Sequence, residues 1–386
     1  MKILHVVPSY LPAIRYGGPI LSVHGLCKGL VRRGHEVHVF TTNVDGPRDS
    51  AVPLGVPVDL DGVKVWYFEV DSLRRLFWAP AMKNALRDWL PTFDVLHTHS
   101  VFLWPTWAAA RAARAHQVPY VLSPRGMLVR ELINRKSTVA KNVWLTMVER
   151  RNLDRSALVH FTSRIEAEDA RSLQLPIHES RIIPNGIELT SFDKQGRAAV
   201  AVRPNGGRLP FILFIGRMNW KKGLDRLIRA LASVPGCRLV VAGNDEEHYQ
   251  PVLQIVAQKA GTSDRITFLG SVDGDEKADL LSRALLLVLP SYSENFGNVV
   301  LEAMAAGCPV VVTPRVGAAD IVRESGGGVV LDGDQECLGA GIRQLISNPS
   351  ALTQMGVMGR EFVRAGYTWD AIANEMDEAY EFVASR

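Results

Sequence analysis

The fold is decided by the segment Leu285-Leu-Leu-Val-Leu289, Pro290-Ser-Tyr-Ser-Glu-Asn-Phe-Gly-Asn-Val-Val-Leu-Glu-Ala-Met-Ala-Ala-Gly-Cys-Pro-Val310. Its first apolar run ends at a turn, a helix is expected to begin near Phe296, and a second apolar run starts at Val310. A strand, a helix and a further strand in this order form a crossover unit of a parallel sheet. The segment therefore predicts an α/β fold.

Similar units recur on both sides of this segment. Short apolar runs separated by helix-length stretches predict strands at Met1–Val7, Glu36–Thr41, Val63–Phe68, Val95–His99, Tyr120–Ser123 and Leu158–Thr162, and then at Phe211–Ile215, Arg238–Ala242, Ile266–Leu269, Leu285–Leu289, Val310–Thr313 and Val329–Leu331. A chain of 386 residues exceeds what one hydrophobic core usually organises. We therefore expect two doubly wound domains in tandem.

The expected boundaries follow from where the periodicity weakens. Between Leu189 and Arg208 the apolar pattern gives way to Lys, Gln, Gly, Arg, Pro and Asn, which indicates a linker. We expect a first domain at 1–190, a linker at 191–208 and a second domain at 209–366. Residues 367–386 are expected to form an amphipathic helix that crosses back to the first domain.

Composition excludes several classes of protein. The chain is 47% hydrophobic and 22% charged, as expected of a globular protein, and no apolar run reaches the roughly 18 residues that a membrane span needs. Without a cleavable signal pattern, a cytoplasmic location is expected. The four cysteines form no CxxC pair, so neither a zinc site nor a disulfide framework is indicated.

Charge is unevenly distributed. The number of Lys and Arg residues minus the number of Asp and Glu residues is 24 − 17 = +7 for residues 1–190 and 20 − 23 = −3 for the remainder. Between Arg125 and Arg155 eight basic residues face three acids, with apolar residues among them. This mixture suits an anionic membrane surface or a phosphorylated acceptor, and a peripheral place on the inner face of the cell membrane would follow. The alternative is a solvated helix that packs its apolar side on its own domain.

The turn before the expected helix near Phe296 is a place for anions, because the N–H groups of a helix's first turn have no partners within the helix. Glu294 lies in this turn and Glu302 lies within the helix. The two carboxylates are too far apart to share a proton, but they can hold different parts of one extended ligand. A sugar and a ribose fit that description. The alternative is a capped helix with two surface glutamates.

Two glutamates with seven residues between them form an element that resembles one in the family 4 glycosyltransferases. The resemblance covers Met1 to about Arg364 and implies the GT-B fold, with two Rossmann-like domains that face a central cleft. It implies that Glu294 contacts hydroxyls of the transferred sugar and that Glu302 binds the ribose of the nucleotide. The backbone around Asn295, Phe296 and Gly297 would complete the sugar pocket.

An arginine and two adjacent lysines follow the first strand of the second domain, in Phe214-Ile-Gly-Arg-Met-Asn-Trp-Lys-Lys-Gly-Leu224. Arg binds phosphate oxygens with paired hydrogen bonds and Lys adds a point charge, so together they suit a diphosphate. The resemblance assigns Arg217 and Lys222 to the leaving diphosphate, with Gly216 beside them. Lys221 is an adjacent competitor that the pattern disfavours. The alternative is a solvated basic loop.

Other donor contacts are implied by the resemblance alone. The glycine pair in Tyr16-Gly17-Gly18-Pro19 would bring backbone close to the donor diphosphate, although a double glycine by itself is more often a plain turn. The loop Gly270-Ser-Val272 would lie near the base of the donor nucleotide, which places Val272 among the donor-binding residues.

Two polar segments end strands of the first domain. His97-Thr-His99 closes the run that begins at Val95, and the resemblance points His99 toward the donor sugar, with His97 a packed strand residue. The alternative is that the two histidines bind a metal ion, but the sequence offers no third ligand nearby. Ser123-Pro-Arg-Gly-Met-Leu128 matches a segment of bacterial polysaccharide transferases and puts Arg125 and Gly126 on the acceptor side. An Arg that bonds loop carbonyls is equally compatible with the pattern.

The resemblance implies a retaining hexosyltransferase of the bacterial exopolysaccharide or lipopolysaccharide type. A UDP-sugar is the first expected donor and GDP-mannose the second, and the acceptor is expected to be lipid-linked or a growing polysaccharide. No metal is expected, because the two cations stand where a metal stands in other transferases. No cofactor and no nucleic-acid partner are expected either. A catalytically silent nucleotide-sugar sensor is one alternative. A dinucleotide oxidoreductase is another, but neither half has GxGxxG after its first strand.

Overall fold

The computed structural model describes residues 1–13, 15, 17–135, 138–193, 210–245 and 247–385. The chain divides into two compact units, Met1–Gly186 together with Trp369–Arg386, and Ile187–Thr368. We call them unit 1 and unit 2. Tyr16 and residues 194–208 of the expected linker lie outside the described residues. No helix within the described ranges is long and apolar enough to cross a bilayer.

Unit 1 is built on an eight-stranded sheet with the order β10-β9-β8-β7-β1-β2-β6-β5 within the described part of the chain. All of its strands pair in parallel except β5, which is antiparallel to β6. The strands are β1 (Lys2–Ser9), β2 (Glu36–Thr42), β5 (Pro57–Leu60), β6 (Val63–Phe68), β7 (Val95–His99), β8 (Tyr120–Ser123), β9 (Leu158–Phe161) and β10 (Ser180–Ile182), with β3 (Val44–Asp45) and β4 (Arg48–Asp49) as a separate hairpin.

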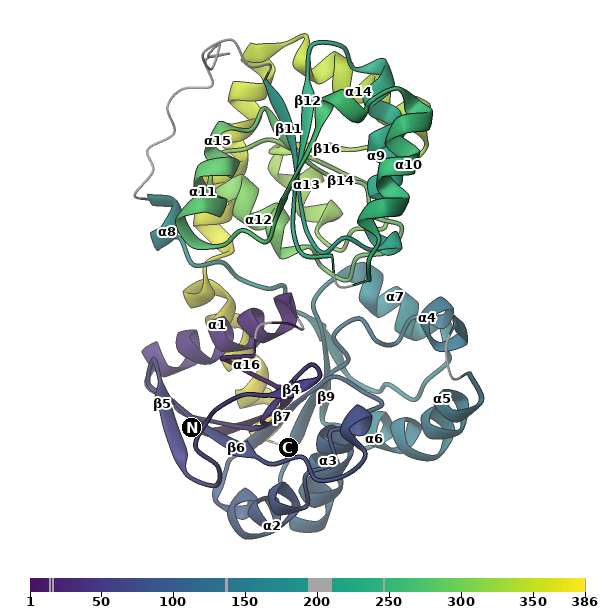
Figure 1. Cartoon of the computed structure of the whole chain (residues 1–386). Coiled ribbons are helices and arrows are strands. Elements are labelled where there is room, and N and C mark those ends of the chain that lie inside the picture. The colour runs from purple at the N-terminus through teal and green to yellow at the C-terminus, as the bar shows by residue number, and fades with distance from the viewer. Residues whose placement is uncertain (14, 16, 136–137, 194–209, 246, 386) are drawn as a thin grey trace. The chain divides into compact units, whose positions relative to one another are not determined.

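Helices cover this sheet on both faces. The terminal helix packs beside the first helix on one face, where Trp369, Met376 and Tyr380 join a core with Ile3 and Leu26 (Figure 1). The helices are α1 (Gly18–Arg32), α2 (Pro80–Trp89), α3 (Trp104–His116), α4 (Arg130–Arg135), α5 (Thr138–Trp144), α6 (Arg150–Asp154), α7 (Arg164–Ser172) and α16 (Trp369–Ala384), with a π-helical turn at Leu145–Glu149 between α5 and α6.

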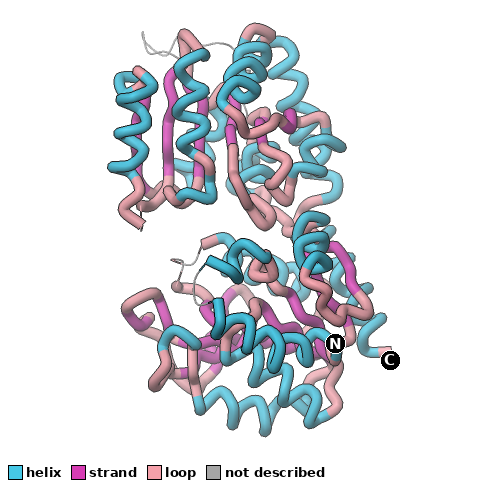
Figure 2. Tube along the Cα trace, turned by 90° about the vertical axis from the view of Figure 1, so that its right-hand side faces the viewer, coloured by secondary structure: helices cyan, strands magenta, loops and turns pink. Residues whose placement is uncertain are grey.

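Unit 2 is built on a six-stranded parallel sheet with the order β13-β12-β11-β14-β15-β16 within its described residues. Helices flank the sheet on both sides (Figures 1 and 2). The strands are β11 (Phe211–Ile215), β12 (Arg238–Ala242), β13 (Ile266–Gly270), β14 (Leu286–Leu289), β15 (Val310–Val312) and β16 (Gly328–Val330), and the helices are α8 (Thr190–Asp193), α9 (Leu224–Ala230), α10 (Gln250–Ala260), α11 (Gly274–Arg283), α12 (Asn298–Ala305), α13 (Ala319–Ser325), α14 (Gln335–Ile346) and α15 (Pro349–Gly366).

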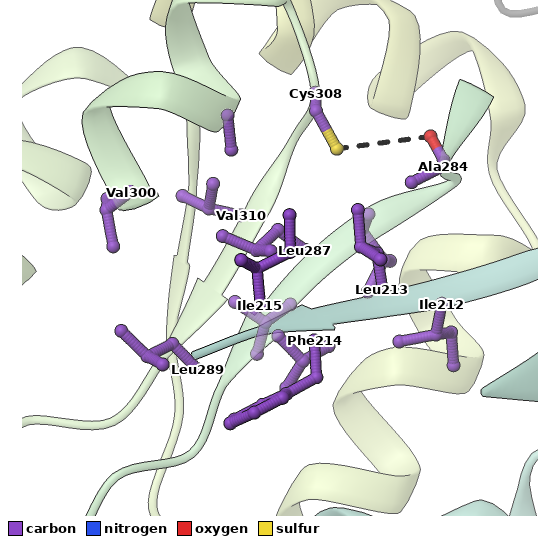
Figure 3. Packing of buried hydrophobic residues seen from close by; sticks show 14 of the residues in the cluster. Ile212, Leu213, Phe214, Ile215, Ala284, Leu287, Leu289, Val300, Cys308 and Val310 are labelled. Carbon is purple, nitrogen blue, oxygen red and sulfur yellow. Dashed lines mark hydrogen bonds between the residues drawn. The ribbon is translucent and has the colours of Figure 1, made fainter. Parts of the chain in front are cut away.

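The core of unit 2 lies between this sheet and its helices. Strand residues such as Leu213, Leu287 and Val310 are fully buried and pack against one another, as Figure 3 shows. Cys308 is a buried thiol that contacts the carbonyl of Ala284 at 3.9 Å. Continuous apolar strands of this kind are typical of a parallel sheet that is covered on both faces.

Each sheet has one place where the strand order reverses. In unit 2 this place lies between β11 and β14, and in unit 1 it lies between β1 and β7. Open α/β sheets bind ligands at the carboxyl ends of the strands that flank such a reversal. The loops that follow β11 and β14 carry Lys222 and Glu294, so the expected donor residues lie where the topology favours a ligand.

Candidate active site

The loops at the carboxyl edge of unit 2 are held together by close backbone contacts. The N–H of Tyr292 donates to the carbonyl of Lys221 at 2.7 Å, which ties the loop after β14 to the loop after β11. Gly223 has a φ of 63°, and a Cβ there would lie 2.1 Å from the carbonyl oxygen of Pro290. A Cβ on Gly317 would lie 1.9 Å from the carbonyl oxygen of Asn295. These glycines let three loops converge around Glu294.

Lys222 and Glu294 form an ion pair through Nζ and Oε2. Their side chains are only 17% and 18% exposed, so the pair lies in the loops rather than on open surface. The backbone of Glu294 is fixed on both sides, since its N–H donates to Arg315 at 3.0 Å and its carbonyl accepts from Gly317 at 2.9 Å. The structure therefore brings these two predicted residues together, in a framework that fixes the glutamate's position.

Glu302 has a partner that the sequence analysis missed. Lys277, on α11, places Nζ 2.5 Å from Oε2 of Glu302, and both side chains are about one fifth exposed. The helix α12 begins at Asn298 rather than near Phe296, because Gly297 adopts a left-handed φ of 88° that a helix cannot include. Glu302 consequently lies only just past the first turn of the helix.

The remaining predicted donor residues lie on the same edge of unit 2. Arg217 is exposed and, among the residues that the structure describes, makes no ion pair with a carboxylate. Gly216 follows β11 and its N–H donates to Ala242 at 2.9 Å, while Val272 follows β13 and packs partly against the core. Phe296 is buried, and its carbonyl accepts from Ala318 at 2.8 Å. Asn295 is half-buried beside it.

The predicted glycine pair of unit 1 caps the first helix. Gly17 is the N-cap of α1, with a φ of 79°, and Gly18 is its first residue. Pro19 favours a helix start here because its φ is preset for a helix's first turn. That turn follows the strand β1, whose carboxyl end lies at the reversal of the sheet.

The two predicted histidines of unit 1 are buried in a larger cluster. His99 and His97 are 1% and 0% exposed, and His5 of β1 and His160 of β9 are also buried. His5 Nδ1 lies 3.0 Å from His99 Nε2, and the two rings are stacked. His97 contacts the hydroxyl of Tyr380 through Nδ1 and Ser123 Oγ through Nε2, both at 2.7 Å.

The partners of these histidines fix the direction of each hydrogen bond. His160 Nε2 lies 2.8 Å from the carbonyl of Ile183, which only accepts, so His160 donates there and accepts at Nδ1 from Ser123. Ser123 must then accept from His97 Nε2, and His97 accepts from Tyr380. Burial lowers the pKa of His5 and of His160 to about 3 and lowers the pKa of His97 and of His99. The histidines are therefore neutral near pH 7.

Arg125 joins this cluster from the loop after β8. Its Nε and one terminal nitrogen both lie 3.2 Å from His99 Nδ1, and its other terminal nitrogen donates to Asn185 Oδ1 at 3.1 Å. The N–H of Gly126 donates to Glu166 Oε1 at 2.5 Å. Both ring nitrogens of His99 are thus occupied within unit 1, and its predicted contact with the donor sugar stays a prediction.

One expectation about this region was wrong. A third histidine does lie beside His97 and His99, because β1 pairs with β7 and brings in His5 from ninety residues upstream; the ring nitrogens of the three lie within 4.8 Å of one another. Gly186 makes room for Trp369, since a Cβ there would lie 2.8 Å from the indole ring.

The histidine cluster predicts a loss of stability in mild acid. The unfolded chain binds protons on His5 and His160 below their ordinary pKa of 6.5, whereas the folded chain does not bind them until about pH 3. Stability therefore falls as the pH drops from 6.5, by about 1.4 kcal/mol per pH unit for each histidine. Urea unfolding at pH 7, 6 and 5 measures this slope. His160→Gln should make it shallower, whereas the exposed His116→Gln should not; equal slopes in both variants would contradict the neutral cluster.

Two parts of the chain match known protein families. Residues 200–362 match the glycosyl transferases group 1, and residues 17–186 match the glycosyl transferase 4-like domain. The chain is 30% identical over 331 residues to D-inositol 3-phosphate glycosyltransferase of Mycolicibacterium smegmatis, covering 82% of this chain and 75% of that protein. It is 29% identical to the phosphatidyl-myo-inositol mannosyltransferase of Mycobacterium leprae, over 96% and 94% of the two chains.

The fold matches solved glycosyltransferase structures as well. The structure of Anabaena HepE in complex with UDP and glucose aligns with a TM-score of 0.74 at 20% identity, over 99% of each chain. The expected α/β fold with two Rossmann-like domains is thereby confirmed. A nucleotide-sugar donor fits both the family and the charged loops of unit 2. The chain therefore belongs to the family 4 glycosyltransferases with the GT-B fold.

Proposed function

We propose that this glycosyltransferase retains the anomeric configuration and moves a hexose from a nucleotide diphosphate sugar to a lipid-linked or polysaccharide acceptor. The observation that carries the proposal is the half-buried Lys222–Glu294 pair at the strand-order reversal of unit 2. The pair puts a phosphate-binding cation next to a carboxylate that can accept hydrogen bonds from sugar hydroxyls. Such a pair suits the point where a sugar joins a diphosphate.

UDP is the first candidate for the nucleotide and GDP is the second. A solved structure with the same fold binds UDP and glucose, whereas a relative in Mycobacterium tuberculosis is named as GDP-mannose-dependent. In either case Glu302 would accept hydrogen bonds from the ribose hydroxyls, as the family resemblance implies. Val272, in the loop after β13, would lie near the base.

The proposed reaction needs no nucleophile from the protein. The bond between the sugar's anomeric carbon and the diphosphate oxygen breaks, and that oxygen keeps the electron pair. Lys222 and Arg217 stabilise the charge that develops on it. The acceptor oxygen attacks on the same face and passes its proton to the departing phosphate. With two cations in this role, we propose that no divalent metal is required.

A thermal-shift screen tests the donor site. We expect one of UDP, GDP or ADP to raise the melting temperature by several degrees, because a ligand at about 100 times its Kd stabilises the folded state by about 2.7 kcal/mol. Glu302→Ala should reduce the shift, and Glu336→Ala, an exposed glutamate of α14, serves as the matched control. The shift and the turnover of the sugar nucleotide should both survive a chelator.

Each departure from that result has a distinct meaning. If no nucleotide shifts the melting temperature, the proposed donor site is wrong. A selective shift without any turnover of the matching sugar nucleotide would favour the silent sensor over the enzyme. Loss of turnover in the chelator, restored by manganese, would overturn the proposed independence from metal.

We also propose that the acceptor is reached at an anionic membrane. The segment from α5 to α6 exposes Val139, Val143 and Met147 at 78%, 52% and 73%, spaced four residues apart on one stretch of helix. Arg150 and Arg151 follow and are exposed. Exposed apolar side chains next to basic ones suit lipid tails beneath anionic headgroups. The named relative in Mycobacterium leprae acts on a phosphatidyl-inositol lipid.

Sedimentation with lipid vesicles tests this contact. We expect binding to phosphatidylglycerol vesicles that weakens with salt, and weak binding to phosphatidylcholine. The double variant V139D/M147D should bind at least several-fold more weakly. V357D/M358D is the matched control, because it changes an exposed apolar pair on α15 of unit 2. If both double variants bind alike, the segment is an ordinary solvated surface.

A further inference from the structure

Arg125 is held in an unusual backbone conformation. It has a φ of 54° and is followed by Gly126 at 75°, so two consecutive residues are left-handed just after β8. A left-handed conformation is uncommon for a residue other than Gly, Asn or Asp and carries a cost in strain. Glu166 stabilises this turn, because it accepts from the N–H of Gly126 and, at its other oxygen, from the N–H and hydroxyl of Thr162. The fold thus fixes the backbone position from which the Arg125 side chain extends.

The guanidinium of Arg125 contacts only neutral partners. Its three hydrogen bonds go to His99 Nδ1, which takes two of them, and to Asn185 Oδ1. Within the described part of the chain it has no carboxylate within 4.0 Å. Glu166 offsets part of its charge from further away, but the oxygens of Glu166 accept from the loop backbone and Thr162. A half-buried cation without a contacting counter-ion is costly in free energy. A bound anion would remove that cost.

The guanidinium retains donors for such an anion. It has five N–H groups, and three are used by His99 and Asn185, which leaves 5 − 3 = 2. One remains on each terminal nitrogen. Paired N–H donors on a fixed cation match the oxygens of a phosphate group. The loop lies at the carboxyl edge of the sheet, the edge where α/β folds bind ligands.

The histidines control the orientation of this guanidinium. Since Arg125 donates to His99 Nδ1, the proton of neutral His99 is on Nε2 and is donated to His5 Nδ1. His5 therefore carries its own proton on Nε2, which is buried without a hydrogen-bond partner. An unsatisfied buried N–H lowers the stability of the folded state. The same arrangement keeps the acceptor His99 Nδ1 facing Arg125.

We propose that Arg125 binds a phosphate group of the acceptor, and that His5 is a positioning residue that orients Arg125 through His99. This inference rests on the proposed function and adds the chemical class of the acceptor, a phosphate ester. The same chemistry is present in the donor diphosphate. The experiment must therefore separate the two sources.

The test measures binding of inorganic phosphate to the full chain saturated with the nucleotide that the thermal-shift screen selects. Saturation occupies the phosphate contacts of Lys222 and Arg217, which leaves Arg125 to be probed. We expect Arg125→Gln to weaken phosphate at least tenfold while leaving nucleotide affinity unchanged, and Arg125→Lys to weaken it less. Unchanged nucleotide binding also shows that the variants are folded.

The outcomes are distinct. If the wild type binds the nucleotide but phosphate binds equally to Arg125→Gln, the inference is overturned and the proposed function stands. If Arg125→Gln instead weakens the nucleotide, Arg125 contacts the donor, which also overturns the acceptor assignment. If no nucleotide binds at all, the proposed function itself fails.

The role of His5 is tested by two conservative variants. Asparagine places its carbonyl oxygen close to where His5 Nδ1 accepts, whereas glutamine places its amide where Nε2 lies. We expect His5→Leu and His5→Gln to weaken phosphate several-fold and His5→Asn to restore it. Nitrogen-15 NMR of the wild type should show His99 with its proton on Nε2, and a proton on Nδ1 would contradict the arrangement.

Discussion

Replacing Lys222 with alanine is expected to slow turnover of the sugar nucleotide by a factor of roughly 10² to 10³, the usual cost of removing one preorganised charged group from a transition state. The lysine is only 17% exposed and is held against Glu294, so its charge acts with little screening by solvent. Negative charge grows on the diphosphate as its bond to the sugar breaks, and Lys222 stabilises it. The effect should therefore fall on kcat more than on KM.

Lys221→Ala is the matched control for this prediction. Lys221 precedes Lys222 in the same short helical turn, and it fixes the neighbouring loop through its backbone carbonyl, which the substitution keeps. We expect its turnover to stay within a factor of about three of the wild type, since the family resemblance assigns the diphosphate contact to Lys222 and not to Lys221. Equal losses in the two variants would mean that general basicity of the loop, rather than a placed cation, supports the reaction.

Much of the fold could be predicted from the sequence because its strands are continuous apolar runs. The expected runs at Val95–His99, Tyr120–Ser123 and Phe211–Ile215 are strands with the same bounds. The antiparallel edge strand β5 and the hairpin of β3 and β4 were not predicted. They are short and only partly buried, so apolar periodicity carries little signal for them.

The partners within the site were harder to predict than the site residues. Lys277 is one charged residue on a polar helix face, and only the packing of α11 near α12 brings it to Glu302. His5 and His160 lie on separate strands, and sheet order alone places them beside His97. Contacts of this kind depend on which strands become neighbours, and a single sequence does not contain that information in its local patterns.

Glu302→Gln is expected to weaken the selected nucleotide by a factor of roughly 10 to 100, because hydrogen bonds to a charged group contribute about 1.5 to 3 kcal/mol each. A ribose hydroxyl donates more strongly to a carboxylate than to an amide. Titration calorimetry with UDP or GDP measures the loss. An affinity equal to that of the wild type would show that Glu302 does not contact the nucleotide.

Lys277 extends this prediction into a test of coupling. Lys277→Gln should weaken the nucleotide by a smaller factor, because Lys277 acts only by orienting the Glu302 carboxylate from 2.5 Å away. The double variant should then match Glu302→Gln alone, since the lysine has nothing left to orient. Arg283→Gln is the matched control, as it removes an exposed cation that pairs with Asp279 on the same helix. Additive losses in the double variant would instead mean that Lys277 contacts the nucleotide itself, and the ion pair with Glu302 would then be one that ligand binding breaks.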